Sequence, residues 1–157
     1  TDLERECLTG KNILGVHIRL TDMGHMHPEY GHVTYDNFKE AIDTSLAKDP
    51  SIDQIFVATD NIISLDKLKQ EYGSLISYVP DLHREQEESI PMHKLERVVY
   101  TMHHTPKAKD FYLEAFYDMW LLSKTHKLIQ RTSALSDCSI AFSNTINEVL
   151  FLGEFNG

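Results

Sequence analysis

The sequence is poor in cysteine and in positive charge, and it has no long apolar run. Its two cysteines, Cys7 and Cys138, can build neither a disulfide framework nor a zinc cluster of several thiolates. No apolar run approaches the roughly 18 residues of a transmembrane helix. Against 24 Asp and Glu stand 15 Lys and Arg, so the formal net charge is −9. Non-specific nucleic-acid binding depends on a positive field, and this balance argues against it.

The chain has the size and composition of one domain, 1–157. It can bury a substantial core, and 41% hydrophobic with 25% charged residues is typical of soluble globular proteins. The sequence begins with Thr1 rather than Met, so the lack of a signal-like segment says little about targeting. No Asn-x-Ser/Thr sequon is present, which favours the bacterial cytoplasm over a Golgi or ER lumen as the expected compartment.

Apolar runs and turn residues predict alternating strands and helices. We expect strands at 12–19, 55–59, 75–79 and 127–130. We expect helices at 1–10, 35–47, 62–72, 111–124 and 133–142. This order predicts an α/β domain with a Rossmann-like parallel sheet and helices on both faces. The polar stretch that runs to about Asp110 is too long for an ordinary connection, so it is expected to be a lid or to contain further structure, such as a helical turn at 95–100.

The first predicted strand ends in the pattern His-x-Arg-x-x-Asp. Side chains alternate along a strand, so His17 and Arg19 share one face. The planar guanidinium of Arg19 suits a phosphate or a carboxylate, and Gly15 leaves room for close approach. The alternative is a core strand that happens to reach solvent, with Arg19 paired to Asp22.

The second predicted strand also ends in polar residues, Thr59-Asp60-Asn61. A right-handed crossover places both strand ends on the same edge of a parallel sheet. Ligands of open α/β sheets bind outside the carboxyl ends of the strands, so these two ends predict a site. Asp60 and Asn61 are equally suited to cap the helix that follows.

At this point the motifs resemble a known family. HIRLTD, then FVATDN, then YDMWLLS and a Thr/Ser-rich turn are similar, in the same order, to the donor-binding half of fucosyltransferases. That superfamily includes α-1,6-fucosyltransferases, nodulation fucosyltransferases and protein O-fucosyltransferases, and the similarity runs from about Asn12 to Phe142. Two features depart from the α-1,6 branch: its second Arg is replaced by Leu20, and the segment 132–136 lacks an adjacent serine pair.

The resemblance implies the C-terminal half of a GT-B glycosyltransferase. Such an enzyme transfers fucose from GDP-fucose to a glycan or protein hydroxyl, with inversion, with no essential metal and with no cofactor besides the donor substrate. The partners implied are the nucleotide-sugar donor, the acceptor and a second, acceptor-binding domain, which is not evident in this sequence.

The resemblance also implies roles for individual residues. Arg19 would be catalytic, because negative charge grows on the departing β-phosphate and a metal-free enzyme must meet it with fixed cations and N–H donors. His17 would contact the diphosphate or the base, and Asp60 and Asn61 would lie on the donor side. Asp118 would accept the N1–H and the exocyclic amine of guanine. The alternatives are a structural, half-buried His17 and an Asp118 on the wet face of its helix.

The turn after the fourth predicted strand is a third candidate region. Backbone N–H groups at a helix start, with the hydroxyls of Thr132, Ser133 and Ser136 beside them, form a ready phosphate site. The competing interpretation is that Ser133 is a plain N-cap, with Asp137 in the first turn. Both interpretations can hold together.

Two other functions stay open at this point. One is a non-catalytic nucleotide-binding module, which the loss of the second Arg at Leu20 favours. The other is a metal-dependent hydrolase built on four residues: His17, Asp22, His25 and His27. Neither these residues nor the pair His103 and His104 match a zinc or iron spacing, so no metal is expected. Asp22 is expected to orient Arg19 or to serve as a turn or cap residue.

Overall fold

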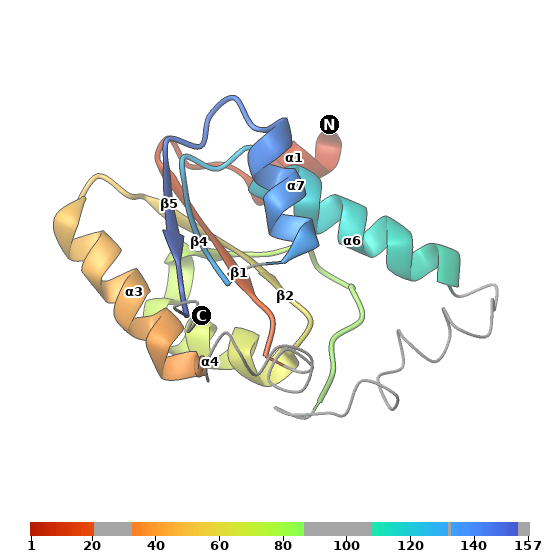
Figure 1. Cartoon of the computed structure of the whole chain (residues 1–157), viewed down its shortest axis with the longest axis horizontal. Coiled ribbons are helices and arrows are strands. Elements are labelled where there is room, and N and C mark those ends of the chain that lie inside the picture. Colours follow the sequence, from red (N-terminus) through yellow and green to blue (C-terminus); the bar gives the residue numbers. More distant parts are fainter. Residues whose placement is uncertain (21–32, 87–107, 132, 154–157) are drawn as a thin grey trace.

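The structure is a five-stranded, fully parallel sheet with helices on both faces. It is a computed structural model that describes residues 1–20, 33–86, 108–131 and 133–153. The strands are β1 (Ile13–Ile18), β2 (Gln54–Thr59), β3 (Ile76–Ser77), β4 (Lys127–Gln130) and β5 (Glu148–Phe151). Their order in the sheet is β3-β2-β1-β4-β5 (Figure 1). The predicted α/β, Rossmann-like class is confirmed.

The helices divide between the two faces according to which half of the sheet they connect (Figure 1). On one face lie α3 (Tyr35–Lys48) and α4 (Ile62–Tyr72), which is followed by the 3-10 turn η2 (Gly73–Leu75). On the other face lie α1 (Asp2–Cys7), α6 (Ala108–Leu122) and α7 (Ala134–Phe142). No helix in the described ranges is both long and apolar enough to cross a membrane.

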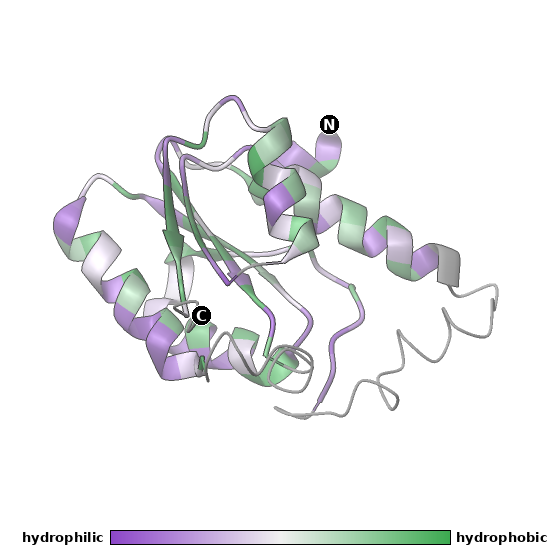
Figure 2. Ribbon diagram, viewed as in Figure 1, coloured by the Kyte–Doolittle hydropathy of each residue, from purple (hydrophilic) through white to green (hydrophobic). Residues whose placement is uncertain are grey.

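Side chains alternate along each strand, so the strands contribute to an apolar core on each face of the sheet. In β1, Leu14, Val16 and Ile18 belong to the apolar cluster that contains buried residues of α3 and α4. Ile13, at the start of β1, points to the opposite face and belongs to the second cluster, with Phe56 of β2 and residues of α6. Figure 2 shows the result, since apolar residues concentrate on the strands while the helices mix apolar and polar residues. This arrangement is typical of a parallel sheet covered on both faces.

Gly15 is required for packing within the protein. A Cβ atom at this position would lie 2.6 Å from Oγ1 of Thr125, which is fully buried. The Thr125 hydroxyl donates to the Leu122 carbonyl at 2.8 Å and so ends α6 against the sheet. The close approach that Gly15 permits is made by Thr125 of the same chain, which fills the space beside it.

Several predicted boundaries differ from those observed. The first helix ends at Cys7 rather than Gly10, because the turn at Thr9 and Gly10 is held by the Gln54 side chain, which accepts from the Gly10 N–H at 2.8 Å. The third strand is only Ile76–Ser77. The expected helical turn at 95–100 lies outside the described residues. The edge strand β5 was not predicted at all.

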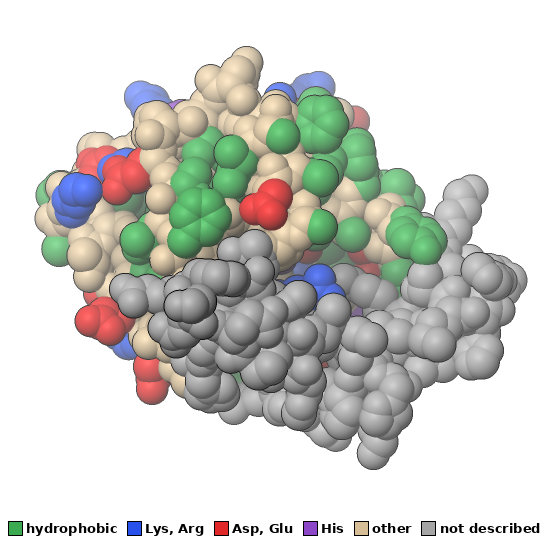
Figure 3. Space-filling view, in the orientation of Figure 1, with side chains coloured by type: hydrophobic (Ala, Val, Ile, Leu, Met, Phe, Trp, Pro, Cys, Tyr) green, Lys and Arg blue, Asp and Glu red, His purple; other side chains and the backbone are tan. Residues whose placement is uncertain are grey.

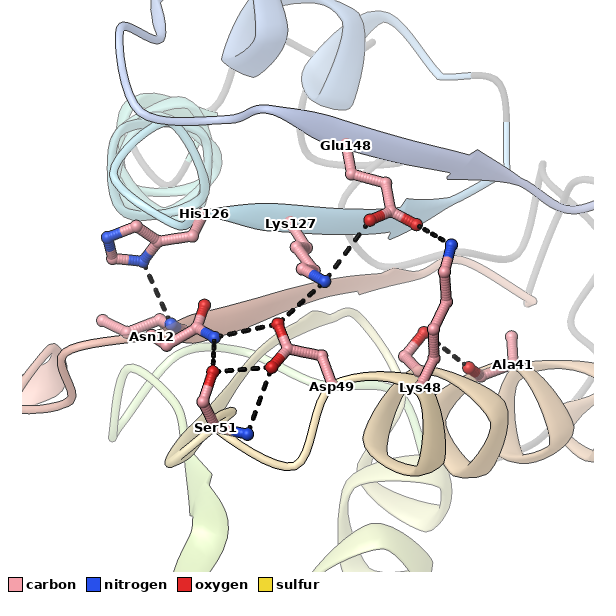
Figure 4. A network of polar contacts seen from close by, with 10 residues as sticks. Asn12, Ala41, Lys48, Asp49, Ser51, His126, Lys127 and Glu148 are labelled. Atoms are coloured by element: carbon pink, nitrogen blue, oxygen red, sulfur yellow. Dashed lines mark hydrogen bonds and ion pairs between the residues drawn. The ribbon is translucent and has the colours of Figure 1, made fainter.

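A polar network ties the amino ends of the strands together (Figure 4). The Asp49 carboxylate, just after α3, accepts from Asn12 Nδ2 at 3.0 Å and pairs with Lys127 Nζ at 2.9 Å. Lys127 also lies 3.3 Å from Glu148 of β5, which pairs with Lys48 at 3.2 Å. Hydrogen bonds from Ser51 and Lys127 hold the pKa of Asp49 well below its usual range. We call these five residues, Asn12, Lys48, Asp49, Lys127 and Glu148, the amino-edge network.

Candidate functional site

The site lies at the carboxyl edge of the sheet, opposite the amino-edge network. Three adjacent strands, β2, β1 and β4, are each followed at once by a charged residue: Asp60, Arg19 and Arg131, respectively. The pairing of His17 with both Ala58 and Gln130 brings these ends level with one another. The strand order also reverses here, because β2 and β3 extend to one side of β1 and β4 and β5 to the other. Such a switch point is where open α/β sheets bind ligands.

His17 lies near the end of β1 and is 6% exposed. It alternates with Val16 and Ile18, so it lies on the face of the sheet that carries α6 and α7. The alternative of a half-buried His17 is not what the structure shows, because the side chain is almost wholly enclosed. Arg19 directly follows the end of β1 and is partly exposed.

Asn61 has a structural role that the sequence had offered as one of two possibilities. It is fully buried, and its Oδ1 accepts from the Ser64 N–H at 2.9 Å at the start of α4. The helix-cap interpretation is confirmed. Asp60 is partly exposed, and its backbone carbonyl accepts from the Glu85 N–H at 2.6 Å. The segment around Glu85 therefore runs beside the end of β2.

Asp118 lies inside the molecule. It is 9% exposed and sits on α6, whose neighbouring residues Leu121 and Leu122 are fully buried against the sheet. The alternative of a solvent-facing Asp118 is wrong. The Asp118 charge affects two groups nearby. The pKa of Cys7 is raised by burial, by Glu6 and by Asp118. The pKa of Arg84 is lowered by burial, and the Asp118 charge opposes this lowering.

Arg84 is a candidate residue that the sequence analysis missed. It is 8% exposed, and its guanidinium donates to the Val79 carbonyl at 2.9 Å and to the Leu82 carbonyl at 3.3 Å. It also lies over the Tyr78 ring, with Cζ 5.5 Å from the ring centroid. One signal could have found it. Because β3 is parallel to β2, the chain after β3 must emerge at the same carboxyl edge as the site.

The turn after β4 carries buried polar groups. Arg131 is 3% exposed, and burial lowers the pKa of its guanidinium. Ser133 occupies the N-cap position of α7, as expected, but its side chain makes no capping bond. Its Oγ is buried and has no hydrogen-bond partner among the described residues. Ser136 is fully buried, and its hydroxyl donates to the Ser133 carbonyl at 3.2 Å.

Gln130 was also missed. It is fully buried, and neither its amide nitrogen nor its amide oxygen has a partner within the described part of the chain. It lies next to His17 in the sheet. A buried amide costs free energy unless it is hydrogen-bonded, so Gln130 marks this end of β4 as a place built for polar contacts.

Some predicted site residues cannot be placed. Asp22 and Thr132 lie outside the described residues, as do His25, His27, His103 and His104. Across the ranges that the structure does describe, no group of three or more His, Cys, Asp or Glu is arranged to hold a metal ion.

The chain was compared with protein families, with curated sequences and with solved structures. No protein-family profile and no curated protein sequence matches the chain. Among solved structures it has the fold of one part of a fucosyltransferase. The matches are NodZ α-1,6-fucosyltransferase soaked with GDP-fucose (17% identity, TM-score 0.56), the same enzyme co-crystallised with GDP (22%, 0.54) and fucosyltransferase NodZ from Bradyrhizobium (21%, 0.55).

Each comparison covers 90% of this chain and 39% of the NodZ chain. The chain therefore spans well under half the length of the proteins that it resembles. The resemblance predicted from the motifs is confirmed at the level of the fold. At these identities the activity and ligands of NodZ do not transfer with the fold.

Proposed function

We propose that this chain is the donor-binding part of a fucosyltransferase and that it binds GDP-fucose at the carboxyl edge of its sheet. The observation that carries the proposal is the alignment of Asp60, Arg19 and Arg131 behind three neighbouring strands. The NodZ-like fold supports it, since NodZ has been soaked with GDP-fucose and co-crystallised with GDP.

In this proposal the diphosphate lies beside β1 and β4. Cleavage of the bond between the sugar and the β-phosphate leaves negative charge on that phosphate. Arg19 meets the charge with a bidentate guanidinium, the largest kind of catalytic contribution available without a metal. The N-terminus of α7 faces the same edge, and the buried Ser133 hydroxyl is available to bind a phosphate oxygen. The reaction proceeds with inversion and needs no metal ion.

The base is guanine in this proposal. Asp118 accepts its N1–H and its exocyclic amine, and His17 contacts the nucleotide from β1. Asp60 lies on the donor side. The side chain of Asn61 is committed to the α4 cap, so its contribution is to shape the strand end. The acceptor, a glycan or protein hydroxyl, binds a second domain that also supplies any catalytic base. We place the enzyme in the bacterial cytoplasm, on the sequence argument alone.

Calorimetric titration of the chain with GDP, UDP and ADP tests the proposal. We expect GDP to bind more tightly than the other two by at least tenfold. Equal affinities would contradict a guanine-linked donor. A preference for GDP without any transfer or donor hydrolysis, when the complete protein is given candidate acceptors, would instead favour the non-catalytic binding module.

A further inference from the structure

We propose that Arg84 is a positioning residue that supplies the buried counter-charge for Asp118 and so keeps this carboxylate ionised for a guanine base. The proposal rests on the proposed function, because guanine is the base proposed there. It adds a residue from a different segment of the chain, between β3 and α6, to the recognition of the donor.

The first observation is that Arg84 is held in place from its own segment. Its two donated hydrogen bonds, to Val79 and Leu82, curl the chain around the guanidinium. The Tyr78 ring covers it on one side. Arg84 is 8% exposed, and its guanidinium is bonded to two neutral carbonyls. A buried cation in such surroundings still needs an anion nearby, because burying an uncompensated charge is costly.

The second observation is that this segment packs along one face of α6. The His83 N–H donates to Glu114 at 3.3 Å, and the His83 ring meets the edge of Phe111 with centroids 5.4 Å apart. Residues 111, 114 and 118 lie on one face of a helix, because they are three and four positions apart. Arg84 follows His83 along the chain, and Asp118 follows Glu114 by one turn along α6.

The third observation concerns the other charged and titratable groups in this region. From α1 come Cys7 and Glu6, and from α6 comes Glu114. The segment after β3 contributes Tyr78 and His83, whose ring lies 3.3 Å from Glu85. By alternation along β1, His17 lies on the same side of the sheet as α6. Arg84 is a permanent cation in this group, and Lys69 is a second one beside Tyr78, with Nζ 4.4 Å from the ring centroid. The Asp118 charge in turn favours the ionised form of Arg84.

The consequence for binding follows from hydrogen-bond chemistry. An ionised carboxylate presents two acceptor oxygens to the two N–H donors of guanine. A protonated Asp118 would place an O–H donor against one of them. Without Arg84, the buried carboxylate loses a positive neighbour, and protonation becomes easier.

The test measures GDP affinity from pH 5.5 to pH 8 in wild type, Arg84→Met and Arg84→Lys. Results are taken as ratios to wild type at each pH, which cancels protonation of the GDP phosphates and of His17. For Arg84→Met we expect the ratio to fall as pH drops, by up to roughly tenfold per pH unit below the new pKa of Asp118. Arg84→Lys should restore most of the wild-type profile. A merely structural role predicts a loss that is the same at every pH, and this result would overturn the proposal.

The matched control is Lys69→Met. Lys69 lies over the same Tyr78 ring, with Nζ 4.4 Å from the centroid, so its removal takes a cation from that ring without touching α6. Its pH profile should follow wild type. A pH-dependent loss equal to that of Arg84→Met would overturn the assignment to Arg84.

A stability cycle keeps the proposal testable if Arg84→Met does not fold. Arg84 and Asp118 carry opposite charges and are both buried, so removing Arg84 leaves Asp118 less compensated. Asp118→Asn should therefore restore stability to the Arg84→Met chain. Glu114→Gln should not. Failure of Asp118→Asn to restore any stability would overturn the pairing. If wild type shows no preference for GDP, the proposed function fails, while this cycle still decides whether Arg84 and Asp118 are coupled.

Discussion

Replacement of Arg19 by Ala should abolish transfer while leaving the fold intact. Arg19 follows directly after β1 and is partly exposed, whereas its neighbour Ile18 is fully buried, so the mutation leaves the core untouched. Hydrogen bonds to charged groups are worth roughly 1.5–3 kcal/mol each, so a bidentate contact to phosphate contributes about 3–6 kcal/mol. Since 1.36 kcal/mol is a factor of ten, a loss of about 4 kcal/mol lowers kcat/KM on the order of a thousandfold.

The assay for Arg19→Ala is steady-state transfer by the complete enzyme, with GDP titration and circular dichroism on this chain. Arg5→Ala is the control, because the Arg5 side chain is 81% exposed on α1 and pairs with Asp2, so its removal takes away an arginine without changing the strand end. Arg19→Lys should also be poor, because a point charge does not reproduce the planar guanidinium. Turnover of Arg19→Ala within a few-fold of wild type would refute the catalytic role.

Four further predictions follow from particular contacts. Asp118→Asn should cut the preference for GDP over UDP by about one to two orders of magnitude, measured by titration, because the amide loses one acceptor; an unchanged preference would remove Asp118 from base recognition. Exhaustive chelation should leave transfer and GDP binding unchanged, and loss of activity that manganese or zinc restores would contradict the metal-free scheme. The pKa values of Asp49 and Glu148 are depressed, so their contribution to stability is present above the ordinary carboxyl pKa range and is lost as the pH falls through the folded-state pKa values. The free energy of unfolding of Asp49→Asn should therefore change less between pH 7 and pH 3 than that of wild type. Denaturant titration at each pH measures this free energy. Gly15→Ala should destabilise by about 1–3 kcal/mol through its clash with Thr125, and adding Thr125→Ala should recover part of the loss; a stable single variant would contradict this packing.

Most of the fold could be predicted from the sequence because its signals are local. β-branched runs that stop in polar residues predicted β1, β2 and β4, and Gly73 marks the end of α4 with a positive φ of 55°. The edge strand β5 lacks a strong apolar run of its own, because it is four residues long and mostly exposed. β5 becomes a strand through its parallel pairing with β4.

The sequence predicts the candidate site only for residues whose position is set by their own strand. His17, Arg19 and Asp60 follow from alternation and strand direction. The direction of β3 brings the segment of Arg84 to the same edge, but in sequence Arg84 and Gln130 each look like an ordinary polar residue. Their burial results from α6 and from neighbouring strands, which are distant along the chain. The same holds for Asp118, because helical periodicity alone did not decide whether its side chain is buried or faces solvent.

Large apolar side chains remain exposed on part of the surface. Figure 3 shows hydrophobic side chains over the region of α6, α7 and β5 on the face in view. The exposed members are Tyr112, Leu113, Phe116, Phe142, Leu150 and Phe151. Single exposed apolar residues are ordinary, but contiguous patches on stable proteins are usually contact surfaces.

The amino-edge network has a consequence for how this domain tolerates change. It fastens β1, β4 and β5 at one edge of the sheet, while the charged residues of the site stand at the other. Substitutions that are well separated and share no partner contribute additively to stability. Residues at the carboxyl edge can therefore be changed one by one without loss of the contacts that hold the other edge together, and the same sheet can accommodate a different ligand.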